Sequence, residues 1–375
     1  MTLLLLLACG TPQGAVDAPA PSRPHGVTDD VVRVGTVLPI SGDADAARIG
    51  RAARDALVAA LAGARPHGRR IELVVHDAPL GSGLMAAKAL VAREDLFALV
   101  APQIDGEEPA LARWVAETGI PVVAPFGGEP ETEPLSPALF WLYGGGDEQI
   151  RAVVHDLRGR SGAALVVGAE AGPWQRRSEV ALAQSARSTV KLQRTTHAEA
   201  CGALAGRGID AVVLDGPAQA ARQWMIAGSA EECPLDLWML GELAPPVLGD
   251  GDIPWFGRVF VASPSRPRAW SPAGLAELRA LVGDSGAEEM PVQVAAVVAA
   301  KLLVEGLELA GPELDRERFV VRLGGLQEFR TGLTPRVSFG AARRVGALGA
   351  WMVERDPRTA AALGGADAER WVVPR

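Results

Sequence analysis

Residues that could carry catalysis are scattered through this sequence without forming a recognisable catalytic or metal-binding pattern. The five histidines stand singly, with no metal-ligand spacing and no neighbouring cysteine. There is no P-loop and no G-x-S-x-G nucleophile elbow, and adjacent acids such as Glu107 and Glu108 would face different ways on a helix. We therefore expect a protein that is not an enzyme and that uses no metal and no cofactor.

Polar, glycine and aromatic residues that follow predicted strands are better candidates, for binding rather than for catalysis. In open α/β sheets, ligands bind outside the carboxyl ends of the strands, where loops and helix N-termini present unpaired N–H groups. Some candidates also have a structural interpretation: Ser41 could cap the next helix, and Phe126 and Trp174 could belong to the core. The candidate ligand-binding residues are Ser41, Asp105, Gly106, Phe126, Gly128, Trp174, Asp215 and Glu242.

The loops that hold these candidates connect short apolar strands with amphipathic helices. Such alternation is typical of right-handed βαβ units in mainly parallel sheets. It starts again after Gly144-Gly145-Gly146, which we interpret as a hinge. The predicted strands are 32–38, 71–76, 96–100 and 120–124 before the glycines, and 163–167, 189–194, 211–214, 235–240 and 258–262 after them.

The chain is long enough for two domains, since its 375 residues exceed the size of one hydrophobic core. We predict an α/β protein with two doubly wound lobes and mainly parallel sheets. Lobe 1 would comprise residues 31–143 plus 263–347, and lobe 2 residues 144–262 plus 348–375. A helix predicted near 291–310 should pack in lobe 1.

The N-terminus has features of an export signal. Five leucines precede Ala8-Cys9, and Leu6-Leu7-Ala8-Cys9 resembles the lipobox of bacterial lipoproteins, although no basic residue precedes the leucines. The resemblance implies acylation of Cys9; a stray leucine-rich start is the alternative. Residues 1–30 would then be a signal, lipobox and flexible tether, because 10–30 are rich in Pro, Gly and Ala. Two further cysteines, Cys201 and Cys233, could form a disulfide or remain separate buried thiols.

The overall charge and hydropathy exclude two classes of partner. There are 37 basic and 45 acidic residues, a net charge of −8, and pairs such as Arg176-Arg177 are expected to be solvated surface. Nucleic-acid binding needs a clustered basic face, so we expect no nucleic-acid partner. No apolar run approaches the length of a membrane-spanning helix, so we expect membrane contact through the lipid anchor only.

Several segments carry a family likeness. They are VVRVGTVLPISG (31–42), LFALVAP (96–102), ETGIPVVAP (117–125), RGIDAVVLDG (207–216), VQVAAVVAAKLLVEGLELAG (292–311) and a terminal hairpin, FRTGLTPRVSFGAARRVGA (329–347). In this order they resemble the type I periplasmic solute-binding proteins of the leucine/isoleucine/valine-binding group. The resemblance implies two lobes joined by three hinge crossovers, a ligand cleft between them, a periplasmic location and delivery of a small molecule to an ABC transporter permease.

The sequence departs from that group where a ligand would be held. Amino-acid-binding relatives have a serine after the third strand and a small-x-Thr element after the fourth, but this chain has Ile104-Asp105 and Phe126-Gly127-Gly128. A carboxylate there would repel a ligand carboxylate. We predict a neutral or cationic ligand, amino-acid-like, with Asp105 and Glu242 as polar anchors. The alternative is a structural or regulatory envelope lipoprotein with a degenerate cleft.

Overall fold

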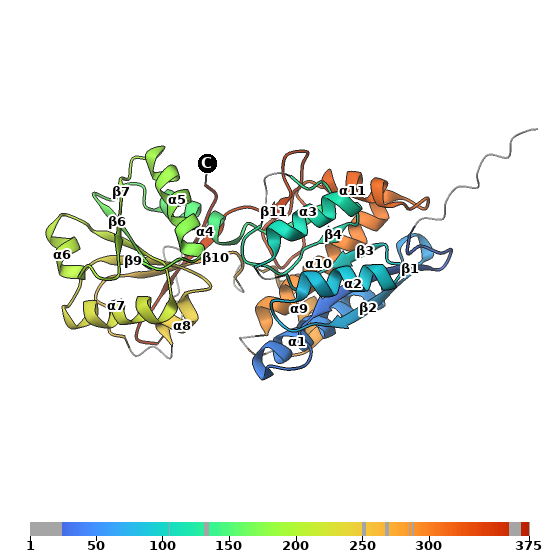
Figure 1. Cartoon of the computed structure of the whole chain (residues 1–375), viewed down its shortest axis with the longest axis horizontal. Coiled ribbons are helices and arrows are strands. Elements are labelled where there is room, and N and C mark those ends of the chain that lie inside the picture. The colour runs from blue at the N-terminus through green and yellow to red at the C-terminus, as the bar shows by residue number, and fades with distance from the viewer. Residues whose placement is uncertain are drawn as a thin grey trace, which may run out of the picture.

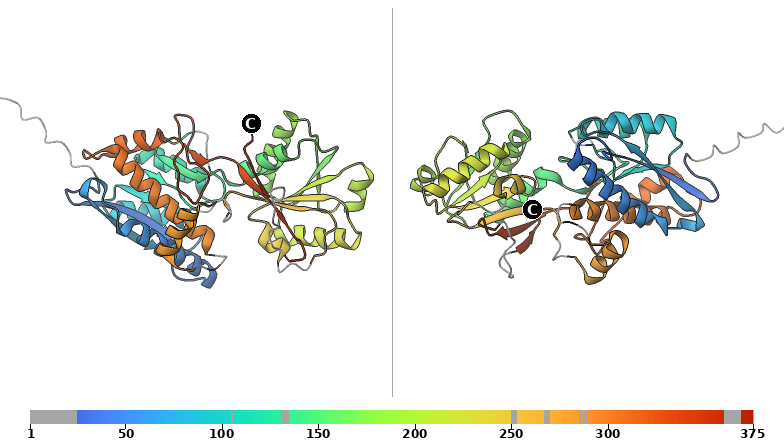
Figure 2. Two further views of the ribbon diagram at one scale, coloured as in Figure 1. Left: turned by 180° about the vertical axis from the view of Figure 1, so that it is seen from behind. Right: turned by 90° about the horizontal axis from the view of Figure 1, so that it is seen from below.

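The computed structural model describes residues 25–104, 106–130, 135–249, 253–266, 270–284, 286, 289–359 and 369–374. In it, two α/β lobes lie side by side, each with a twisted sheet covered by helices on both faces (Figures 1 and 2). This arrangement confirms the predicted fold class.

Lobe 1 is built on a parallel sheet with the strand order β11-β5-β4-β3-β1-β2. Its strands are β1 (Val31–Leu38), β2 (Arg70–Asp77), β3 (Ala98–Val100), β4 (Val122–Val123), β5 (Leu139–Tyr143) and β11 (Val345–Ala347). Its helices are α1 (Ala44–Ala62), α2 (Gly83–Arg93), α3 (Glu108–Thr118), α9 (Pro272–Val282), α10 (Met290–Ala310) and α11 (Arg316–Gly324), with a 3₁₀ turn at Pro66–Gly68.

Helix α10 is the largest contributor to the lobe 1 core. Val294, Val297 and Leu303 are among its fully buried residues, and they share one apolar cluster with α1 and β1. The expectation that no apolar run approaches a membrane-spanning length is wrong for α10, which is long and apolar enough by length and composition. In the structure this helix is packed inside lobe 1, because its apolar residues form the core. Burial of its aliphatic side chains stabilises the lobe by about 1.5–3 kcal/mol for each fully buried one.

Lobe 2 has the strand order β13-β12-β10-β9-β8-β6-β7, parallel except for β12 and β13, which pair antiparallel at the edge. Its strands are β6 (Ala163–Val167), β7 (Leu192–Thr196), β8 (Ala211–Leu214), β9 (Asp236–Leu240), β10 (Val259–Ser263), β12 (Ala350–Arg355) and β13 (Glu369–Val372). Its helices are α4 (Gly145–Asp156), α5 (Pro173–Ala186), α6 (Cys201–Gly206), α7 (Ala218–Ala230) and α8 (Ala244–Leu248).

Three crossovers join the lobes among the described elements: β5 to α4, β10 to α9, and β11 to β12. Strand β5 was not predicted. It is a short run of buried residues with no alternation, and periodicity does not separate such a run from other apolar segments. The expected terminal hairpin is reduced to two isolated bridges, Phe329 with Val337 and Gly340 with Arg343. Strand β11 instead pairs in parallel with β5.

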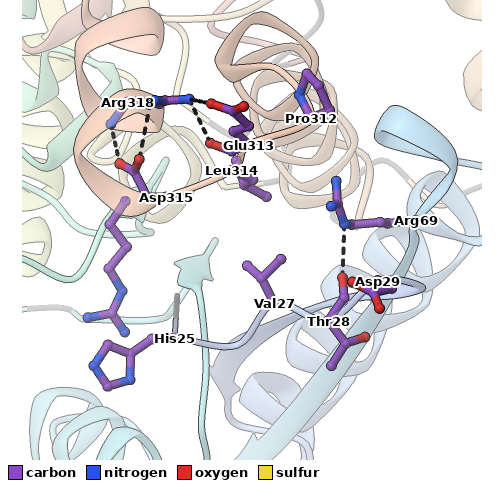
Figure 3. A pocket seen from close by; sticks show the side chains of 11 residues that line it. His25, Val27, Thr28, Asp29, Arg69, Pro312, Glu313, Leu314, Asp315 and Arg318 are labelled. Carbon is purple, nitrogen blue, oxygen red and sulfur yellow. Dashed lines mark hydrogen bonds and ion pairs between the residues drawn. The ribbon is translucent and has the colours of Figure 1, made fainter. Parts of the chain in front are cut away.

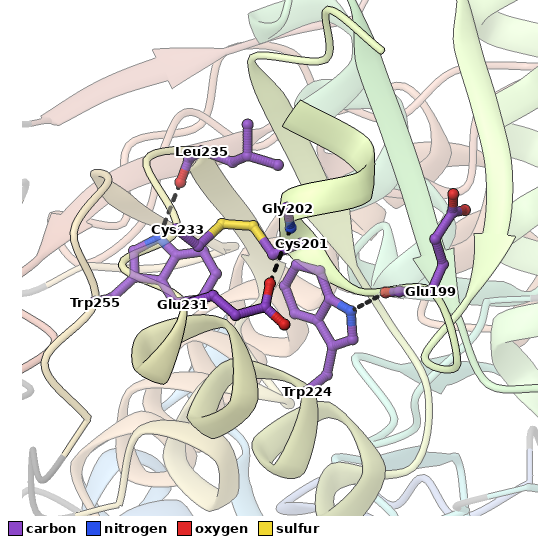
Figure 4. Close-up of a disulfide and its surroundings, with 8 residues drawn as sticks. All are labelled: Glu199, Cys201, Gly202, Trp224, Glu231, Cys233, Leu235 and Trp255. Carbon is purple, nitrogen blue, oxygen red and sulfur yellow. Dashed lines mark hydrogen bonds between the residues drawn. A yellow bond between two sulfur atoms is a disulfide. The ribbon is translucent and has the colours of Figure 1, made fainter. Parts of the chain in front are cut away.

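A disulfide joins Cys201 at the start of α6 to Cys233 after α7, so one of the two alternatives for these cysteines is realised (Figure 4). Their Cα atoms are 6.0 Å apart, and both residues are buried. Trp224 and Trp255 flank the bond, and their indole N–H groups donate to the carbonyls of Glu199 and Leu235. The bond therefore fastens the two helices on one face of the lobe 2 sheet.

Candidate functional site

The carboxyl ends of the strands in both sheets lead into loops at the junction of the lobes. A pocket of about 320 Å³ lies there, with walls from lobe 1, from lobe 2 and from the crossovers. It is lined by Gln103, Ala124, Pro125, Phe126, Gly127, Gly128, Trp141, Leu142, Tyr143, Gly145, Gly146, Gln149, Glu242, Pro264, Pro291, Val292 and Ala295.

The lining of this interlobe pocket is mostly apolar and aromatic. Among the described residues that line it, Glu242 is the charged one. Gln149 uses its side-chain oxygen to accept a hydrogen bond from the Gly241 N–H, at 3.2 Å. Burial raises the pKa of Tyr143 to about 12, so this side chain remains a neutral phenol.

Beside the pocket, Arg177 on α5 holds three carboxylates. Its guanidinium donates to both oxygens of Asp215, at 2.7 and 2.8 Å, and lies 2.7 Å from Glu242 Oε1. The third partner, Glu129, belongs to lobe 1, and its Oε1 accepts from Arg177 Nη1 at 3.1 Å. The Arg177 side chain is only 4% exposed, which makes this ion cluster a buried link between the lobes.

Glycines let the lobe 1 loop approach the start of α4. Gly145 has φ +65°, a conformation that favours glycine, and a Cβ there would collide with the Gly128 carbonyl. A Cβ on Gly146 would collide with the Glu129 carboxylate. The close approach lets Glu129 Oε2 accept from the Asp147 N–H at 3.0 Å.

Burial shapes the ionisation of this cluster. It raises the pKa of Glu129 to about 6, and the nearby Asp147 carboxylate adds to the rise, whereas the Asp147 N–H and Arg177 oppose it. For Arg177, burial acts to lower the pKa, but the hydrogen bonds and charge of Asp215 outweigh it, so the pKa is raised and the guanidinium stays charged.

Three of the predicted ligand-binding residues line the pocket: Phe126, Gly128 and Glu242. Phe126 is half-buried and forms part of the wall. The Gly128 N–H donates to Glu108 Oε1 at 2.9 Å. Glu242 contacts Arg177 and also reaches the pocket, and its side chain is 54% exposed.

The other predicted residues lie elsewhere. Ser41 is exposed and donates to Asp77, while Asp43 rather than Ser41 caps α1. Gly106 is exposed before α3, and Asp105 lies outside the described residues. Trp174 packs against the lobe 2 core and donates to the Glu170 carbonyl, so its structural interpretation holds.

Sequence reasoning missed Arg177 and Glu129. The Arg176-Arg177 pair was expected to be solvated, and this is wrong for Arg177, which is buried because it shares the inward face of α5 with Ala181 and Ser185. The i, i+4, i+8 spacing of these residues is a signal that could have placed Arg177 inside. Asp215, its main partner, is buried with it.

A larger hollow of about 660 Å³ lies at the opposite end of lobe 1, near the amino ends of β1 and β2 (Figure 3). Its charged groups largely satisfy one another: Arg318 pairs with Glu313 and Asp315, and Arg69 donates to the Thr28 carbonyl. The residues that line it all belong to lobe 1 and the segment leading into it, so lobe closure would not enclose a ligand there.

Comparison with known proteins identifies the family. The family model described as periplasmic binding protein matches residues 31–360. The chain belongs to the periplasmic binding protein family. No curated protein matches the sequence significantly.

Solved structures agree with this family assignment at the level of the fold. An ABC transporter substrate-binding protein from Desulfitobacterium hafniense in complex with Leu is 14% identical, with a TM-score of 0.69 over 92% of this chain and 100% of that one. A branched-chain amino acid transporter substrate-binding protein from Streptococcus pneumoniae in complex with isoleucine is 16% identical, with a TM-score of 0.66 over 92% of this chain and 100% of that one. A fatty acid ABC transporter substrate-binding protein from Thermomonospora curvata is 15% identical, with a TM-score of 0.64 over 94% of each chain.

Membership of the periplasmic binding protein family has two consequences. The family consists of solute-binding proteins rather than enzymes, as the sequence predicted. It also implies an extracytoplasmic location. The interlobe pocket lies where a type I periplasmic binding protein fold would enclose a solute, since closure of the lobes brings its walls together.

Proposed function

We propose that this chain is a lipid-anchored, extracytoplasmic receptor that captures a small amino-acid-like solute and delivers it to the permease of an ABC importer. The interlobe pocket carries the proposal, because both lobes and the crossovers supply its walls. The similar structures include complexes with leucine and isoleucine and a fatty acid ABC transporter substrate-binding protein, which supports a small organic ligand.

The ligand is neutral or cationic in this proposal, with Glu242 as its polar anchor and Phe126 and Gly128 beside it. Glu242 is the charged side chain in the described lining, and half of its surface is accessible. A second carboxylate about 4 Å from it would be repelled by about 4 kcal/mol at an effective dielectric of 20. Asp105 remains proposed as a second anchor from sequence alone.

A thermal-shift screen tests the receptor function. A solute that binds the folded state raises the melting temperature, and at a hundredfold excess over Kd the gain in stability is about 2.7 kcal/mol. Glu242→Gln should lower this gain to about 1.4 kcal/mol or less at the same solute concentration, because at least a tenfold loss of affinity is expected. Glu170→Gln, which removes an acid from lobe 2 outside the pocket, should leave it unchanged. A pocket that responds to no solute would contradict the proposal.

Lipid anchoring through Cys9 is the second part of the proposal, and Cys9 lies outside the described residues. The lipobox-like Leu6-Leu7-Ala8-Cys9 and the Pro- and Gly-rich segment after it support this part. Membrane fractionation tests it: Cys9→Ser should move the protein from the membrane to the soluble fraction. Unchanged fractionation would contradict the anchor and leave the receptor function standing.

A further inference from the structure

Two groups near the interlobe pocket could hold a ligand carboxylate: the Arg177 guanidinium and the N–H groups that open the 12-residue helix α4. A guanidinium and a helix N-terminus are both strong partners for anions. In this protein other groups already hold Arg177 and two of these N–H groups, those of Gly146 and Asp147.

Glu129 occupies both of these partners at once. Its Oε1 accepts from Arg177 at 3.1 Å, and its Oε2 accepts from the Asp147 N–H at 3.0 Å. The preceding N–H on α4, that of Gly146, points at the Gly128 carbonyl, at 3.4 Å. The Glu129 carboxylate lies directly against Gly145 and Gly146, which line the pocket, so it is placed behind these two glycines. Neither Glu129 nor Arg177 is among the described residues that line the pocket.

The remaining charge near the pocket is negative. Arg177 contributes one positive charge, while Glu129, Asp215 and Glu242 contribute three negative ones, so the cluster carries −2 when ionised. Glu242 is the member that reaches the pocket lining. The rest of the described lining is mainly aromatic and aliphatic, with Phe126, Trp141 and Val292 among its walls.

We propose that Glu129 is an internal carboxylate that fills the anion site of the cleft, so that the pocket selects small apolar amines without a carboxylate over amino acids. The inference rests on the proposed receptor function and specifies its ligand class. The ammonium group lies against Glu242, and the apolar body lies against the walls of lobe 1. A ligand carboxylate beside Gly145 and Gly146 is repelled by Glu129, which already occupies Arg177 Nη1 and the Asp147 N–H.

Three matched probes separate the groups of such a ligand: 3-methylbutylamine, L-leucine and 4-methylpentanoate share one branched apolar body. Calorimetric titration of the full chain at pH 8, where Glu129 is ionised, should show the amine binding at least about tenfold more tightly than leucine and than the acid. Leucine or 4-methylpentanoate binding as tightly as the amine would overturn the inference.

Removal of Glu129 should reverse this preference. In Glu129→Ala, Arg177 Nη1 and the Asp147 N–H lose the Glu129 carboxylate and its negative charge is removed, so the affinity ratio of leucine to amine should rise at least about tenfold. Glu117→Ala removes an exposed acid of α3, and it should keep the wild-type ratio. If Glu129→Ala does not fold, Glu129→Gln keeps the shape, removes the charge and should raise the ratio in the same direction. An unchanged ratio in a folded Glu129 variant would overturn the inference.

Failure of the ligand class and failure of the receptor function give different results. If none of the three probes binds but another solute raises the melting temperature, the amine preference is wrong and the receptor function stands. If no solute in a broad screen binds, both are wrong.

Discussion

The two lobes contribute different chemistry to the cleft between them. Lobe 1 supplies apolar walls, including Phe126, Trp141 and Val292, whereas lobe 2 supplies charge, through Arg177, Asp215 and Glu242. The ligand that we propose therefore has an apolar body and a polar end. Glu129 is the exception, since it is a lobe 1 acid whose partners belong to lobe 2.

The largest expected effect on stability comes from removing Arg177, which pairs with all three acids of the ion cluster. Arg177→Met leaves Asp215 buried without its bidentate partner, which should lower the free energy of unfolding by about 3–5 kcal/mol. Arg187→Met is the control, at an exposed arginine directly after α5, and it should cost less than about 1 kcal/mol. Urea unfolding monitored by tryptophan fluorescence measures both. Equal losses would show that Arg177 does not organise lobe 2.

This cluster also marks the limit of what the sequence could predict. The alternation of strands and helices was enough to predict the two lobes. Positions after strands led to Phe126, Gly128 and Glu242, which line the interlobe pocket; their role in ligand binding stays a prediction. Arg177 and Glu129 are 48 residues apart, and no local pattern indicates that they pair. Their contact depends on how one lobe is placed against the other, which periodicity within either lobe does not specify.

The two lobes also differ in the feature that stabilises each of them. Lobe 1 has the long buried helix α10, and lobe 2 has the Cys201–Cys233 disulfide. Replacing both cysteines by alanine should cost about 3–4 kcal/mol, because the sequence separation of 32 residues sets the loop entropy. Calorimetry should show this loss in the lobe 2 transition. A destabilised lobe 1 with an unchanged lobe 2 would contradict the assignment.

The link through Glu129 predicts a pH dependence. Burial raises the pKa of Glu129 from 4.5 to about 6, so its contribution to stability is fully present below pH 4.5 and is lost as the pH rises through about 6. The loss amounts to about 2 kcal/mol for a shift of about 1.5 pKa units. In Glu129→Gln this decline should be absent, and urea titrations at pH 4.5 and pH 7.5 measure the difference. Parallel pH profiles for the two proteins would show that Glu129 is not the group that titrates.

The apolar side of the cleft is tested by Phe126→Ala. Loss of this wall should weaken binding of an apolar ligand by about 1–2 kcal/mol, roughly tenfold, with little change in the melting temperature of the free protein because Phe126 is only half-buried. Phe256→Ala removes an exposed phenylalanine of lobe 2 and serves as the control. If both variants bind alike, the ligand does not lie on lobe 1.

The central claim is that the pocket between the lobes binds a small solute through Glu242, and calorimetric titration of Glu242→Gln tests it most directly. The titrant is the solute that most raises the melting temperature of the wild-type protein. The account predicts at least about a tenfold loss of affinity in Glu242→Gln and wild-type affinity in Glu170→Gln. Wild-type affinity in Glu242→Gln would contradict it.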